Sequence, residues 1–103
     1  MSQRVVIFLL DAATEAEAAE SWYFERDAEV ARRFRSALAV AVDKITDAPE
    51  RWPSTSAGAH RVLLEGFPYA VHYRVDERAI VIAAVAHQRR RPGYWQQRGS
   101  GRK

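Results

Sequence analysis

Near its C-terminal end the chain carries residue types that could bind or cleave nucleic acid. An apolar run ends at His87, three consecutive arginines follow at residues 89–91, and Tyr94 and Trp95 come shortly after them. Arginine offers phosphate a planar, permanently charged set of donors, and aromatic rings offer faces on which bases stack. A histidine can act as acid or base near neutral pH. This pattern predicts a site for phosphate and bases, and it leaves open whether that site cuts nucleic acid or only binds a partner.

The charge of the chain supports a basic surface in its second half. Residues 1–59 hold seven Lys or Arg and ten Asp or Glu, a net charge of −3, whereas residues 60–103 hold nine and three, a net charge of +6. Fourteen of the sixteen basic residues are arginines. A basic half of this kind predicts a surface that faces an acidic partner.

Length and composition limit the class of protein. The chain has 103 residues, enough for one small folded domain, which we expect at residues 1–98 with a polar, disordered tail at residues 99–103. It has no cysteine, which excludes disulfides and thiolate metal sites, and we expect neither a metal nor a cofactor. No apolar run approaches the roughly 18 residues of a membrane span, and no secretory signal is seen, so we expect a cytoplasmic protein.

Apolar periodicity predicts six elements in the order β-α-α-β-β-β. The expected strands are residues 4–10, 60–65, 69–75 and 79–87, and the expected helices are residues 12–26 and 27–47. Asp27 is expected to cap the second helix, and Pro49 ends it because the residue before a proline is pushed away from helical geometry. The short links predict an antiparallel helical hairpin and antiparallel neighbouring strands.

These elements predict an α+β domain of two layers. The helical hairpin must bury its apolar stripe on one face of a mainly antiparallel four-stranded sheet, and the other face is left partly open. The strand at residues 79–87 is apolar on both faces, which predicts a central position in the sheet. Trp22 and Trp52 are expected to be packing residues, and Trp95 is expected to fold back over the sheet edge.

Alternation along the strands predicts which side chains lie on the open face. Arg61, His72 and Arg74 fall on the side away from the apolar positions that should meet the helices. Together with His87 and Tyr94, they could converge on one concave basic surface. Each residue alone has an ordinary structural explanation, such as a solvated arginine or a hydrogen-bonded histidine. Only their convergence favours a functional site.

Motifs at regular intervals cover nearly the whole chain. They are an acidic, alanine-rich helix at residues 12–24 that contains Trp22-Tyr23, residues 48–53, Arg61-x-x-Leu64, residues 66–75, and residues 80–87 followed by Arg90. In these motifs the chain resembles the RelE/ParE superfamily of toxins from bacterial type II toxin–antitoxin modules, often labelled plasmid stabilisation proteins. The Phe67-Pro68-Tyr69 turn and the strand after it are the most specific part. The resemblance implies a growth-inhibiting toxin that is neutralised by an antitoxin encoded by an adjacent gene.

One branch of the superfamily cuts mRNA in the ribosomal A site without a metal ion. Attack of a 2′-hydroxyl on phosphate needs a base, an acid for the leaving oxygen, and cations for the charge on phosphorus. By resemblance, Arg61 and Arg74 would hold phosphate, and His87 would serve as acid or base. Tyr94 would stack a base or position the leaving group. Glu50 is an alternative base, in a loop that lacks the lysines some ribonuclease members carry.

Another branch poisons DNA gyrase and has no known nuclease activity. It needs only a long helical hairpin and a basic C-terminal region that touches a protein target. The sequence favours an endoribonuclease acting on mRNA at the ribosome, with gyrase inhibition as the alternative and an attenuated, antitoxin-binding module as the third. Residues expected to bind the nucleic acid or the target are Arg89, Arg90, Arg91, His72 and Trp95. The antitoxin should lay acidic and apolar side chains over the basic open face or along the hairpin.

Overall fold

The computed structural model describes residues 4–54 and 58–99 and contains the predicted elements in the predicted order. They are β1 (Val5–Phe8), α1 (Leu10–Arg26), α2 (Ala28–Asp47), β2 (His60–Leu63), β3 (Tyr69–Val75) and β4 (Ala79–His87). The first helix starts at Leu10, earlier than predicted, and β1 and β2 are shorter than predicted. Of the predicted tail at residues 99–103, only Gly99 lies within the described part. No helix in that part is long and apolar enough to cross a membrane.

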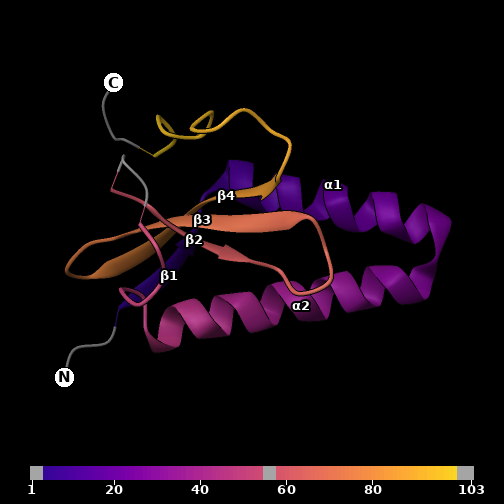
Figure 1. Ribbon diagram of the computed structural model, residues 1–103, viewed down its shortest axis with the longest axis horizontal. Helices are drawn as coiled ribbons and strands as arrows, with labels where there is room; N and C mark the ends of the chain where they lie inside the picture. Colours follow the sequence, from indigo (N-terminus) through magenta and orange to yellow (C-terminus); the bar gives the residue numbers. More distant parts are fainter. Residues whose placement is uncertain (1–3, 55–57, 100–103) are drawn as a thin grey trace.

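The sheet has four strands in the order β1-β4-β3-β2 (Figure 1). β2, β3 and β4 pair as antiparallel neighbours, whereas β1 runs parallel to β4. β4 lies between β1 and β3, as its apolar character on both faces predicts. The predicted α+β fold with a mainly antiparallel sheet is therefore confirmed.

Two helices form the layer on one face of the sheet. Asp27 separates them, and its carboxylate accepts a hydrogen bond of 2.9 Å from the Glu29 amide, which makes it the predicted N-cap of α2. Phe34 of α2 packs in one buried core with Val71 and Tyr73 of β3. The apolar set of β3 therefore meets the helices, and the alternate set lies on the other face, as predicted.

The other face of the sheet is partly covered by residues 88–99, which we call the C-terminal segment. In Figure 1 this segment, coloured toward yellow, lies on the side of the sheet opposite α2. Trp95 is only 3% exposed and packs on Ala83 and Ala84. A register shift beside His72 leaves Ala83 without a partner in β3, so that two small side chains lie together under the indole. Trp95 thus folds back over the sheet, and the open face is smaller than the sequence suggested.

Candidate functional site

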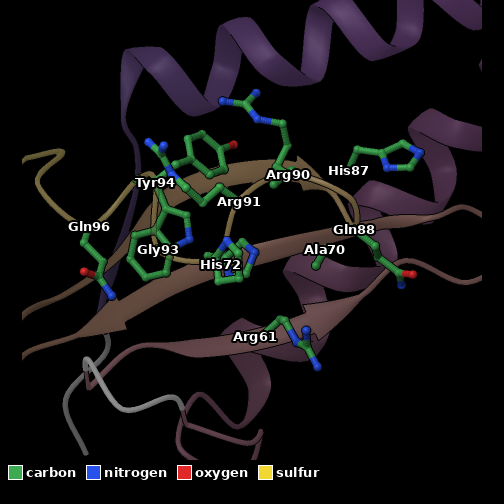
Figure 2. A pocket seen from close by; sticks show the side chains of 13 residues that line it. Arg61, Ala70, His72, His87, Gln88, Arg90, Arg91, Gly93, Tyr94 and Gln96 are labelled. Atoms are coloured by element: carbon green, nitrogen blue, oxygen red, sulfur yellow. The ribbon is translucent and has the colours of Figure 1, made fainter.

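A cavity of about 370 Å³ opens between the sheet and the C-terminal segment. Its lining residues include Arg61 from β2, His72 from β3, and Arg90 and Arg91 from the C-terminal segment. In Figure 2 His72 lies between Arg61 and Arg91. No aspartate or glutamate lines this cavity within the described part of the chain. The cavity is therefore cationic and would attract an anionic group.

His72 forms part of the cavity but is not a charged group. Its ring stacks on the Trp95 indole with a centroid distance of 5.0 Å, and its buried Nδ1 receives no hydrogen bond from any described residue. Burial, helped by the nearby charge of Arg61, lowers the pKa of His72 to about 4, against an opposing effect of Glu15. The imidazole is therefore neutral at physiological pH and contributes shape rather than charge.

The C-terminal segment is tied to α1 through Glu15, Tyr94 and Arg98, which we call the Glu15 cluster. The Glu15 carboxylate accepts hydrogen bonds of 2.5 Å from the Tyr94 hydroxyl, 3.0 and 2.9 Å from the Arg98 guanidinium, and 3.0 Å from the Val85 amide. Burial alone would raise the pKa of Glu15, but these donors outweigh it and the pKa lies below its usual range. Glu15 is therefore an ionised acceptor with four donors around it.

Tyr94 is occupied at both its hydroxyl and its ring. Burial and the hydrogen bond to Glu15 raise the pKa of Tyr94 to about 12. The guanidinium groups of Arg90 and Arg98 lie 3.9 and 4.8 Å from the ring centroid. In this conformation the phenol is a structural donor, and its ring is engaged by cations rather than open to a base.

Arg74 serves the C-terminal segment rather than the cavity. Its guanidinium donates a hydrogen bond of 2.5 Å to the backbone carbonyl of Arg98 and lies 6.0 Å from the Trp95 ring centroid. The residue lies on the open face, as predicted, but it is not among the residues that line the cavity. The Arg74 guanidinium therefore holds the backbone of the C-terminal segment against the sheet.

His87 lies at the end of β4 with its imidazole on the helix side of the sheet. The residue borders the cavity, yet its ring meets the ring of Tyr69 edge-on at 5.2 Å, and Tyr69 packs against the core shared with the helices. The bulge at Ala83 causes this placement, because one extra residue reverses the alternation in the rest of β4. Arg61, by contrast, pairs with His72 on the other face. The two candidate catalytic side chains therefore point to opposite faces.

Glu50 lies at the far end of the sheet from His87. Its carboxylate is 3.7 Å from the Arg4 guanidinium, and Arg4 donates a hydrogen bond to the carbonyl of Asp76 in the turn before β4. The whole length of β4 separates that turn from His87. The Glu50 carboxylate is therefore separated by the length of β4 from His87 and from the arginines that follow it.

The expected convergence on one surface thus holds only in part. The structure brings together around the cavity Arg61, His72, Arg90, Arg91, Tyr94 and Trp95. It separates from them the carboxylate of Glu50 and the imidazole of His87, and the exposed Arg89 is not among the lining residues. Within the described residues no group of three or more His, Asp or Glu side chains is placed to hold a metal ion.

A second, more apolar groove of about 610 Å³ lies between α1 and the sheet. Trp22, Tyr23, Tyr69 and His87 border it. Trp22 is 51% exposed, so the expectation that it is a packing residue was wrong. A half-exposed tryptophan beside an apolar groove is typical of a surface that binds another protein.

Comparison with known proteins identifies the family. A family model described as "ParE toxin of type II toxin-antitoxin system, parDE" matches residues 6–92, most of the chain. The chain belongs to the ParE toxin family. This ParE toxin therefore shares its family with the toxin components of type II toxin–antitoxin systems, as the resemblance in the sequence implied.

A solved structure shows the same fold as this ParE toxin. The structure, described as "Chromosomal ParDE TA system from P. aeruginosa", superimposes with a TM-score of 0.72 at 19% identity and covers 82% of this chain and 96% of that chain. At such an identity the likeness concerns the fold alone. No curated protein matches the chain significantly. Tyr94, Trp95 and Arg98 lie beyond the part that the family model matches.

Proposed function

We propose that this ParE toxin inhibits DNA gyrase by binding it and does not cleave RNA. One observation carries the proposal: the imidazole of His87 and the guanidinium of Arg61 lie on opposite faces of the sheet. General acid–base cleavage needs both groups within hydrogen-bond reach of one phosphate. Membership of the ParE family supports the same proposal, because the branch of the RelE/ParE superfamily that poisons gyrase is the ParE-like one.

The remaining candidates do not restore an acid–base pair at the cavity. Tyr94 has a pKa of about 12 and already donates its proton to Glu15. His72 has a pKa of about 4 and is stacked under Trp95. What is left at the cavity is a set of arginines, and arginine at neutral pH can bind an anion but cannot exchange protons.

The basic surface is the proposed contact with the target. Arg89, Arg90 and Arg91 are exposed at the turn that follows β4, and Arg61 is exposed beside the cavity. Among the described residues none of these four forms an ion pair with an acidic side chain. Unpaired arginines on one surface can meet acidic side chains of a protein or the phosphates of DNA held by it.

A cognate antitoxin is the second proposed partner, and we place both encounters in the cytoplasm. The apolar groove beside Trp22 would accept the apolar residues of an antitoxin segment, and the acidic residues of that segment would face the nearby Arg90. Membership of the ParE family, which is described as the toxin of the parDE toxin–antitoxin system, supports an antitoxin partner, and the groove is our proposal for where it binds.

The proposal is tested by expressing the chain without antitoxin and following DNA replication and protein synthesis separately. Gyrase inhibition predicts an early loss of replication, breaks in chromosomal DNA and intact mRNA. Early loss of translation with cuts in ribosomal A-site codons would instead identify a ribonuclease. Absence of any growth defect in cells that contain the folded chain would favour the attenuated antitoxin-binding module.

A further inference from the structure

The Glu15 carboxylate of α1 accepts a hydrogen bond from the backbone of β4, a bond that a neighbouring strand would otherwise accept. β1 pairs with β4 only as far as Phe8 and Ile82, and the chain then enters α1. Beyond that point the amide of Val85 donates to the Glu15 carboxylate at 3.0 Å. The Glu15 side chain is 18% exposed, so its carboxylate is largely shielded from solvent.

Arg98 joins the same carboxylate to the end of the C-terminal segment. Besides its two hydrogen bonds to Glu15, its guanidinium donates to the carbonyl of Ala83 at 3.1 Å and lies 3.5 Å from the Asp11 carboxylate. Its backbone carbonyl accepts a hydrogen bond from Arg74. One residue therefore fastens the segment to α1, β3 and β4 together.

The Glu15 cluster reaches the exposed arginines through Tyr94. The Tyr94 hydroxyl is fixed by Glu15, and its ring carries the Arg90 guanidinium at 3.9 Å. Arg90 lies between the other two arginines of the turn. A flexible turn would have to be ordered on binding, and each side chain ordered in advance lowers that cost.

We propose that Glu15 and Arg98 are positioning residues that hold the C-terminal segment in one conformation and so present Arg89, Arg90 and Arg91 together to the target. This inference rests on the proposed function only for the identity of the target. Neither residue is expected to touch the target itself, because both side chains are more than four-fifths buried.

The test measures the conformation of the segment and the strength of toxicity in the same variants. Glu15→Gln keeps the size of the side chain but removes its charge, and Glu17→Gln, on an exposed position of α1, is the matched control. Hydrogen exchange of residues 88–99 should accelerate in Glu15→Gln, while α1 and the sheet keep their protection. Loss of one charged hydrogen-bonded pair should weaken growth arrest and gyrase inhibition about tenfold.

Two further variants separate positioning from general stability. Arg89→Gln combined with Arg91→Gln should weaken toxicity without changing exchange in the segment, because neither side chain belongs to the Glu15 cluster. Arg98→Lys keeps the charge and should retain more toxicity than Arg98→Met. If Glu15→Gln loses the fold, Tyr94→Phe replaces it, since only one hydroxyl is removed and the same direction of change is expected.

Each outcome decides the inference. It is overturned if the segment exchanges at the wild-type rate in Glu15→Gln, or if exchange rises while toxicity stays the same or increases. Growth arrest serves as a readout that does not depend on the target. If the wild-type chain arrests growth but leaves gyrase active, the proposed function fails, and the positioning role stands or falls on exchange and growth arrest together.

Discussion

Arg98 and Glu15 form a two-point ion pair with nitrogen–oxygen distances of 3.0 and 2.9 Å across 83 residues of sequence. Their side chains are 19% and 18% exposed, which removes much of the solvent screening that weakens surface ion pairs. The pair closes the C-terminal segment onto the first helix. The Glu15 carboxylate also accepts a hydrogen bond from the hydroxyl of Tyr94, a residue that the sequence suggested would take part in RNA cleavage.

The first prediction concerns acid stability. The pKa of Glu15 is lowered in the folded chain from a usual value of 4.5, so its stabilising contribution is fully present above pH 4.5 and is lost as the pH falls through the folded value. Glu15→Gln should be less stable than wild type at pH 7 and should lose less on further acidification. Urea unfolding between pH 7 and 3 measures both effects. Parallel pH profiles for the two proteins would contradict the prediction.

A second pH effect comes from His72 in a different window. Its pKa falls from 6.5 to about 4 on folding, so the unfolded chain binds a proton first as the pH drops. Stability should therefore decrease from pH 6.5 toward pH 4. His72→Phe keeps an aromatic ring against Trp95 and should flatten this part of the profile. An unchanged slope in the variant would show that His72 is not the responsible group.

The two tryptophans at residues 22 and 95 should differ sharply in their effect on stability. Trp95 is 3% exposed, and truncation of a buried tryptophan to alanine costs about 3–5 kcal/mol in the free energy of unfolding. Trp22 is 51% exposed, and its truncation should cost less than about 1 kcal/mol. Chemical denaturation of Trp95→Ala and Trp22→Ala provides the comparison. Equal losses would mean that Trp95 does not anchor the C-terminal segment.

The elements of this fold depend on local signals and were predictable from sequence. Asp27 and Pro49 mark helix boundaries by their own backbone chemistry, and the apolar strand β4 fell in the centre of the sheet as expected. The contacts of the candidate site were harder to predict from the sequence. Helical spacing places Glu15 on the same face as the buried Ala12 and Ala19, but only the path of residues 88–99 brings Arg98 to it.

The position of His87 shows why alternation alone fails near a bulge. Strict alternation from Ile82 would place His87 on the open face with Arg61. Because Ala83 is an extra residue, Val85 turns to the helix side and His87 follows it. Nothing in a run of small apolar residues announces a bulge, so this error could not be avoided from the sequence.

Substitution of the separated candidates should leave toxicity intact. His87→Gln and Glu50→Gln remove the two groups that the sequence suggested as acid or base. Because they lie on another face and at another end of the sheet, growth arrest should stay within about twofold of wild type, a change of less than about 0.5 kcal/mol. Colony counts after induction, with protein levels matched, measure this. Loss of toxicity in a folded His87→Gln chain would support a catalytic role.

The most direct test of binding without cleavage uses purified components. The chain is incubated with DNA gyrase, relaxed plasmid and ATP, and in parallel with ribosomes carrying a defined mRNA. We predict that supercoiling is inhibited at toxin concentrations that leave the mRNA intact. Cleavage of mRNA in the ribosomal A site with undiminished supercoiling would contradict this conclusion.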